Sequence, residues 1–152
     1  MSMKRFLILL SFALAFICNI KSQDISTNVI PNQVKKAFQH KYFNVTNAKW
    51  EIKNQYYEVA FRLDLKKHTS EFDKAGIWLN TRTTLKLVDV TIAIKNAIKK
   101  SFSKYRIIQI NKVESKDKAS FYEIIFNQSS TDITIQFAPE GKILDRNVDI
   151  KE

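Results

Sequence analysis

The sequence predicts an α+β protein with two tandem helix-plus-antiparallel-strand repeats, which form a two-layer domain with one partly open sheet face. An internal repeat is the first observation behind this fold class, because residues 56–61 (YYEVAF) recur as 121–126 (FYEIIF). A shared turn is the second, because residues 72–79 and 137–144 match at the same spacing and contain the two glycines of the chain, Gly76 and Gly141. A repeat of this length is typical of one supersecondary unit used twice.

Residues 1–22 are predicted to be a signal peptide rather than part of the fold. Lys4 and Arg5 precede an apolar run at residues 6–17, which is shorter than the roughly 20 apolar residues that a membrane-spanning helix needs. Cleavage after Ser22 would leave a periplasmic or secreted protein without a transmembrane segment. One alternative is that the segment is an N-terminal core helix or a retained anchor. Another is lipidation of Cys18, which the bulky residue before that cysteine disfavours.

The charge and the cysteine content limit the partners and the sources of stability. The chain carries a formal net charge of +10 and stays basic without its signal peptide. Export argues against nucleic acid as a partner, whereas an exported or envelope protein or an anionic envelope polymer would fit. Cys18 is the single cysteine, so the mature chain has no disulfide and must be stabilised by core packing.

Each repeat, residues 23–87 and 88–152, is expected to begin with an amphipathic helix and to pack with the other as one domain. Pro31 suits a first helical turn because its missing N–H would have no intrahelical partner there. Asp89 or Thr91 is the expected cap of the second helix. Apolar residues then recur at helical spacing: Val34, Ala37, Phe38 and Tyr42 in the first repeat, and Ile94, Ala97, Ile98 and Phe102 in the second.

Four strands are expected after each helix because side chains alternate between apolar and polar there. The predicted strands cover residues 48–53, 56–63, 67–72 and 77–85, and then 107–114, 121–127, 133–137 and 142–148. The second repeat needs a longer loop, which we place at residues 115–119. Gly76 and Gly141 should each close a hairpin loop in the left-handed conformation, which penalises other residues.

Four segments of the first repeat, residues 31–38, 48–51, 56–61 and 72–79, resemble the PepSY-like, β-lactamase-inhibitor-like exported bacterial proteins. The second repeat keeps Tyr122, Glu123 and Gly141 but lacks the tryptophan and the turn aspartate. The resemblance implies a periplasmic or surface protein that binds proteins or acts as an inhibitor. Its motifs are packing and turn residues, so they specify the fold, and no inhibitory motif can be carried over.

Catalytic, metal and cofactor sites are not predicted. His40 and His68 lack a metal-ligand spacing, and the chain has neither a nucleophile motif nor a phosphate-binding glycine loop. Glu58 and Glu123 occupy matched positions, as paired catalytic carboxylates could, but the repeat alone explains their matching. The protein is therefore predicted not to be an enzyme.

Lysines on the two helices permit two interpretations. They could form an anion-binding surface, or they could simply be the solvated side opposite each apolar stripe, which we favour. The lysines concerned are Lys35, Lys36, Lys41, Lys95, Lys99, Lys100 and Lys104.

The open sheet face is the predicted binding site. If Tyr57, Val59 and Phe61 face the core, alternation turns their neighbours outward, and the same parity turns Trp78 outward, Leu79 inward and Ile143 outward. Tyr, Trp and Arg are enriched in interface hot spots, although aromatic residues can also pack across strands. The candidate binding residues are Tyr56, Arg62, Trp78, Arg82, Phe121 and Ile125.

These observations predict an exported, non-enzymatic binding module, inhibitor-like in character, that uses its open sheet face. The alternative is a structural cell-envelope protein that is attracted to anionic polymers or lipid head groups through its lysine-rich helices.

Overall fold

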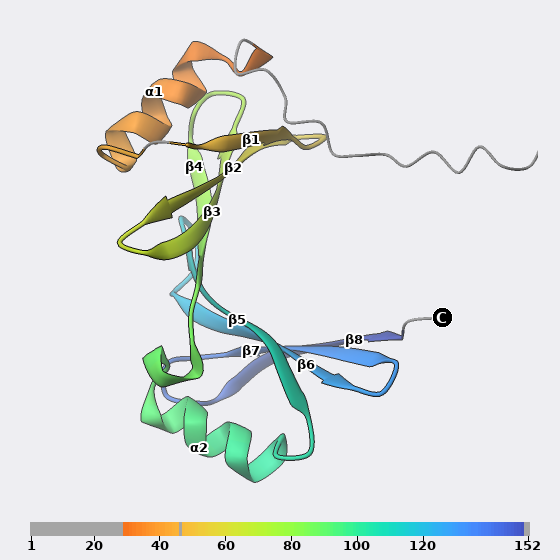
Figure 1. Cartoon of the computed structure of the whole chain (residues 1–152). Helices are drawn as coiled ribbons and strands as arrows, with labels where there is room; N and C mark the ends of the chain where they lie inside the picture. The colour runs from red at the N-terminus through yellow and green to blue at the C-terminus, as the bar shows by residue number, and fades with distance from the viewer. Residues whose placement is uncertain (1–28, 46, 151–152) are drawn as a thin grey trace, which may run out of the picture.

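The computed structural model describes residues 29–45 and 47–150 (Figure 1). The predicted signal peptide, its cleavage site and Cys18 lie outside the described residues. Within them, neither helix is long and apolar enough to cross a membrane. The elements are α1 (Asn32–Lys41), β1 (Lys49–Ile52), β2 (Tyr56–Leu63), β3 (Lys66–Asp73), β4 (Trp78–Thr84), η3 (a 3-10 helix, Leu87–Asp89), α2 (Ile92–Ser101), β5 (Arg106–Ser115), β6 (Phe121–Gln128), β7 (Thr131–Phe137) and β8 (Ile143–Ile150).

All strands belong to one eight-stranded sheet in sequential order from β1 to β8, with every neighbouring pair antiparallel. Within each half, short hairpin connections place consecutive strands side by side, whereas the connection from β4 to β5 runs through η3 and α2. The two helices lie at opposite ends of the molecule, with the strands between them (Figure 1).

Both helices cover the same face of the sheet. One row of directly paired residues, which point to one face, runs across β2 to β6: Phe61, His68, Thr83, Lys112 and Tyr122. Phe61 is part of the core under α1, and Tyr122 packs against the core under α2. The opposite face, which we name the open face, carries neither helix. The prediction of an α+β fold with a partly open sheet face is therefore confirmed.

Both helices pack as the sequence predicts and begin close to the expected residues, although Pro31 is the N-cap residue of α1 rather than part of its first turn. Pro31 precedes the first residue of α1, and Val34 and Phe38 are buried on its inner side. Thr91 caps α2, because its Oγ1 accepts a hydrogen bond of 3.3 Å from the backbone N–H of Ile94. An N-cap of this kind satisfies one of the four unpaired N–H groups at a helix start.

The hydrophobic core consists of two clusters, one under each helix. Ile30, Val34, Phe38, Trp50, Val59, Phe61 and Phe72 form the cluster under α1. Val90, Ile94, Ile98, Phe102, Ile110, Ile124, Phe126, Ile133, Ile135 and Phe137 form the cluster under α2. Each half of the chain thus buries its own apolar side chains, and the continuous sheet joins the halves.

The ladder between β4 and β5 makes that join. It pairs residues from Asn80 with Ser115 to Thr84 with Asn111. The extra residues of the second half, predicted as a loop at 115–119, lie only partly in a loop. They also lengthen β5 to 10 residues, against 4 in β1. The added length gives β4 a partner strand, because residues near Ser115 belong to this ladder.

The two turn glycines have the predicted left-handed backbone, with φ of +83° at Gly76 and +84° at Gly141. The structure adds a second reason for glycine, since both turns lie against the start of a helix. A Cβ atom at Gly76 would come within 2.8 Å of the Gln33 carbonyl oxygen, and one at Gly141 within 2.7 Å of the Ala93 carbonyl oxygen. Side chains reinforce each contact: Gln33 Nε2 donates to the Lys74 carbonyl (2.9 Å), and Thr91 Oγ1 donates to the Pro139 carbonyl (2.7 Å).

We expect Gly76→Val and Gly141→Val each to destabilise the fold by about 1–3 kcal/mol, because a β-branched residue is strained at positive φ and its Cβ would collide with a helix carbonyl. Thermal melting of the purified variants measures this effect. Ala75→Val, an exposed change in the first turn, is the matched control and should melt close to wild type. Unchanged melting of both glycine variants would contradict the prediction.

Candidate functional site

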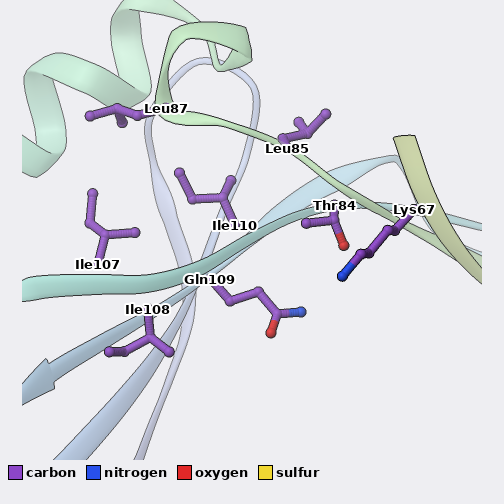
Figure 2. Close-up of a pocket in the computed structure, with 8 residues that line it drawn as sticks. All are labelled: Lys67, Thr84, Leu85, Leu87, Ile107, Ile108, Gln109 and Ile110. Atoms are coloured by element: carbon purple, nitrogen blue, oxygen red, sulfur yellow. The ribbon is translucent and has the colours of Figure 1, made fainter. Parts of the chain in front are cut away.

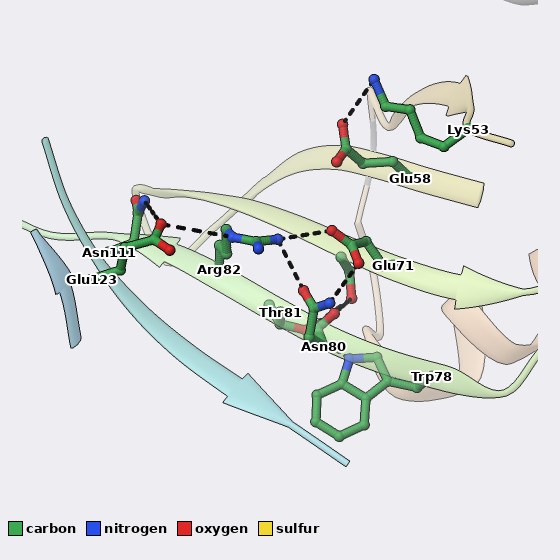
Figure 3. A network of polar contacts seen from close by, with 10 residues as sticks. Lys53, Glu58, Glu71, Trp78, Asn80, Thr81, Arg82, Asn111 and Glu123 are labelled. Atoms are coloured by element: carbon green, nitrogen blue, oxygen red, sulfur yellow. Dashed lines mark hydrogen bonds and ion pairs between the residues drawn. The ribbon is translucent and has the colours of Figure 1, made fainter. Parts of the chain in front are cut away.

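Arg82 lies at the centre of a polar network on the open face, close to the join between the two halves (Figure 3). Its Nη1 pairs with Glu71 Oε1 at 2.8 Å and donates to Asn80 Oδ1 at 3.3 Å. Its Nε lies 3.9 Å from Glu123 Oε1, across the join. Asn111 Nδ2 donates to the same Glu123 oxygen at 3.4 Å. The network therefore connects strands of both halves, from β3 to β6.

The network orders its own side chains. Asn80 Nδ2 donates to Glu71 Oε2 at 2.5 Å, so both carboxylate oxygens of Glu71 are engaged. The side chains of Glu71 and Glu123 are only 12% and 18% exposed. A hydrogen bond to an ionised carboxylate, such as those that Glu71 accepts, is stronger than one between neutral groups. Arg82 is thus fixed in place while part of its side chain stays accessible to a partner.

Three carboxylates stand in register on neighbouring strands, and one of them, Glu71, belongs to this network. Glu51 pairs with Glu58, and Glu58 pairs with Glu71, on neighbouring strands. Burial raises the pKa of the Glu58 carboxyl, the Lys53 ammonium opposes that rise, and the nearby Glu71 and Glu51 carboxylates add to it. The Nζ atom of Lys53 lies 2.6 Å from Glu51 Oε2 and 3.9 Å from Glu58 Oε1. Its pKa is raised, chiefly by the hydrogen bond to Glu51.

A polar hollow of about 470 Å³ extends from the acidic row to the join. It is lined by Lys53, Tyr56, Glu58, Thr69, Glu71, Arg82, Thr84, Gln109 and Asn111. The hollow brings two predicted residues, Tyr56 and Arg82, to one place. It offers a partner both acidic and basic groups within one concave surface.

Two apolar residues of β6 continue the open face into the second half. Phe121 pairs with Val113, and Val113 pairs with Arg82. Val113 is only 3% exposed, so its neighbours shield it. Ile125 lies two residues beyond Glu123 on the same strand face. Phe121 and Ile125 thus lie on the open face as predicted, on either side of Glu123.

Arg62 also lies on the open face but at some distance from the Arg82 network. It pairs with Lys67 on β3 and lines other hollows with that lysine. The sequence therefore predicted one site where the structure has two neighbouring surfaces.

The predicted outward orientation of Trp78 is wrong. Trp78 packs against the core under α1, and its Nε1 donates to Thr81 Oγ1 at 2.8 Å. Thr81 in turn is hydrogen-bonded to Ser70 (2.8 Å) and Tyr42, within a hydroxyl cluster on the helix side of the sheet. The Lys41 ammonium lies 3.8 Å from the centroid of the indole, a cation–π contact. Trp78 therefore supports the α1 side and does not belong to the open face.

A β-bulge causes this reversal. Glu71 pairs with Asn80, but the next pair is Phe72 with Trp78, so Leu79 is the extra residue of β4. An extra residue shifts the alternation of side chains by one position. Trp78 consequently shares the face of Phe72, and Leu79, predicted to point inward, lies in the bulge. The same irregularity, with Leu144 as the extra residue, pairs Ile143 with the buried Phe137, so Ile143 shares the sheet face of Phe137 rather than the open face, although it is 45% exposed.

Several polar residues in and beside the network were not among the predicted site residues. Lys53, Glu71 and Asn111 are polar residues that strand alternation alone would leave as ordinary surface. Asn111 stands out only in the structure, where this polar residue is buried, with 3% of its surface exposed. Its hydrogen-bond partners on other strands are Thr84 of β4 and Glu123 of β6, which strand alternation alone does not align with it. Within residues 29–45 and 47–150, no three His, Cys, Asp or Glu side chains are grouped to hold a metal ion.

Comparison with known proteins gives one family. The family model described as "Putative beta-lactamase-inhibitor-like, PepSY-like" matches residues 17–69 and 55–145. No curated protein sequence matches the chain.

Solved structures share the fold. A BLIP-like protein from Bacteroides fragilis is 21% identical, with a TM-score of 0.73 over 80% of this chain and 88% of its own. A DUF2874 family protein from Bacteroides uniformis and a "putative periplasmic" protein from Bacteroides eggerthii are each 20% identical, with TM-scores of 0.74 over 78% of this chain and 88% of theirs. At this level of identity the likeness concerns the fold alone.

We expect Trp78→Ala to lower the stability of the protein by about 2 kcal/mol, because it removes a half-buried indole and leaves the hydroxyl cluster short of a donor. Phe61→Ala, in the same core, should cost about 3–5 kcal/mol. Chemical denaturation of both variants measures these losses. A Trp78→Ala variant as stable as wild type would restore the outward orientation that the sequence suggested.

We expect Glu58→Gln to stabilise the protein at neutral pH. Folding raises the pKa of the Glu58 carboxyl, so its ionised form destabilises the folded state. This loss of stability is fully present above the pKa of the folded state and is absent below the unfolded value of about 4.3. The gain at pH 7 should be about 0.5 kcal/mol, the size of a like-charge pair on adjacent strands, and should vanish near pH 3. Melting across this pH range tests it, with the exposed Glu140→Gln as control. A gain that persists at the acidic end would show that charge is not its cause.

Proposed function

Because this chain belongs to the PepSY-like, beta-lactamase-inhibitor-like family, we propose that it is an exported, non-enzymatic module that captures a protein partner on its open face. The single observation that carries the proposal is the network around Arg82. It holds charged and amide side chains in fixed positions on a sheet face that neither helix covers. Groups that are ordered before binding lose less entropy on association.

The composition of the open face suits a protein interface. The proposed contact surface has Arg82 at its centre, with Tyr56 on one side and Phe121 and Ile125 on the other. Arginine and aromatic residues are the types that most often dominate binding energy. Arg62 would lie at the rim. In this proposal Trp78 does not contact the partner. Its packing on the α1 side of the sheet instead holds β4 in register under the contact surface.

The remaining parts of the proposal concern export and ancestry. The basic and apolar N-terminal segment supports a signal peptide and a periplasmic or secreted location, and the "putative periplasmic" protein of the same fold agrees with it. We also propose that the two halves are copies of one helix-and-strand unit, since each glycine turn contacts the start of the helix in its own half.

We expect Ile125→Lys to weaken partner capture by at least about tenfold, because it places an unpaired charge within the proposed contact surface. The matched control is Ile92→Lys, the same change at a residue of α2 that is 76% exposed. Capture from cell-envelope extract by immobilised protein, followed by quantification of each bound protein, measures the effect. Both variants should melt close to wild type for the comparison to count.

The outcomes separate this proposal from attraction of the helix lysines to anionic polymers. A partner that Ile125→Lys loses and Ile92→Lys keeps, with little dependence on salt, supports the open-face site. Capture that both added lysines strengthen, and that falls steeply with ionic strength, would favour the polymer alternative. Equal loss in both variants would overturn the proposal.

A further inference from the structure

We propose that a trough beside the first residues of β5 binds a single-chain anionic amphiphile, such as a long-chain carboxylate. The apolar chain would lie against β5, and the anionic head would lie near Lys67. This inference goes beyond the proposed function, and the residues that test it, Lys67 and Ile108, are not part of the proposed contact surface around Arg82.

The trough exists because β4 ends before β5 does. The paired residues of β4 and β5 stop at Thr84 and Asn111, and one further hydrogen bond joins the Leu85 N–H to the Ile110 carbonyl at 2.9 Å. The chain then leaves the sheet toward η3. Residues 106–109 therefore pair with β6 but have no strand beside them on the β4 side.

A β-bulge lies beside this gap, and its extra residue is apolar and lines the trough. Ile107 pairs with Phe126 and Gln109 with Ile125, so Ile108 is the extra residue of β5. Its side chain is 46% exposed. Bulges often occur next to functional sites, where they redirect a side chain.

The trough has an apolar end and a basic end. It encloses about 510 Å³ and is lined by Lys67, Thr84, Leu85, Leu87, Ile107, Ile108, Gln109 and Ile110. Leu87, Ile107 and Ile108 lie at one end, and Lys67 and Thr84 at the other (Figure 2). Sites for small ligands usually have this size and combine an apolar lining with a few polar groups.

Further cations surround the basic end. An adjacent hollow of about 490 Å³ shares Lys67, Thr84 and Leu85 and is also lined by Arg62, Lys66 and Lys86. Among the described residues, none of these four cations forms an ion pair. Of the two acids there, Asp89 already accepts the Lys86 backbone N–H at 3.1 Å. The local charge is therefore positive, which favours an anionic head group.

Exposed apolar residues around the trough also support an amphiphilic ligand. Leu65, at the tip of the β2–β3 hairpin, is 96% exposed and has a positive φ of 63°, and Val88 is 73% exposed. Both line the adjacent hollow. Clustered apolar side chains on a surface commonly mark a binding site. An amphiphile satisfies both ends at once, whereas a small anion would leave the apolar end uncovered and a cationic amphiphile would oppose Lys67.

Isothermal titration of the mature protein with dodecanoate, below its micelle concentration, tests the proposal. Dodecanoate should bind at one site, acetate should not bind, and dodecyltrimethylammonium should bind at least about fivefold more weakly, because the head-group interaction changes sign. These comparisons use wild-type protein and so do not depend on the folding of a variant.

Two variants locate the site. Lys67→Gln should weaken dodecanoate binding about fivefold, the size of one exposed ion pair. Ile108→Thr, which keeps a β-branched residue in the strand, should weaken it by a similar factor through lost apolar contact. Lys99→Gln on α2 and Val148→Thr on β8 are the matched controls, and both should bind as wild type does.

Three results would overturn the proposal: no binding of dodecanoate, equal binding of the cationic amphiphile, or equal weakening by the controls. A dimer that Ile108→Thr dissociates, in the absence of dodecanoate binding, would instead assign the trough to contact between copies of the chain. Because neither Lys67 nor Ile108 belongs to the Arg82 surface, failure here would leave the proposed protein capture to be judged by Ile125→Lys alone.

Discussion

The ladder between β4 and β5 is the constraint on which the rest of this structure depends. Each half of the chain has its own helix and its own buried cluster, and β4 and β5 are the elements through which the halves mainly meet. Backbone hydrogen bonds in a ladder fix both the distance and the register of two strands. Without this ladder the two halves would have no common face.

Both candidate sites follow from where the ladder runs and where it stops. Along its length it places Arg82 of β4 within 3.9 Å of Glu123 on β6, so one polar network spans the join. Beyond Thr84 the ladder ends, and the unpaired start of β5 leaves the trough lined by Ile107 and Ile108. Where β4 and β5 are paired, they form the open face with the Arg82 network, and where their pairing stops, they leave the trough.

The bulges decide which side chains reach those surfaces. At Leu79 the extra residue turns Trp78 toward the α1 core, where its indole N–H and its ring both find partners. At Ile108 the extra residue exposes an apolar side chain that strict alternation would have placed differently. The polar character of the open face follows as well, since the large aromatic residue that would have dominated it lies on the other side.

The sequence by itself determined the elements of this protein, and the tertiary structure decided which of them face each other. Local signals were sufficient for the helices after Pro31 and Thr91, for the strands and for the left-handed glycines at 76 and 141, because periodicity, capping and φ preference act over a few residues. The open face was predictable from alternation at Tyr56, Arg82, Phe121 and Ile125. Trp78 was not, because a bulge is a property of two strands and reverses parity without changing composition. The Arg82 network and the trough beside Ile108 likewise depend on register across β4 and β5, which only long-range pairing sets.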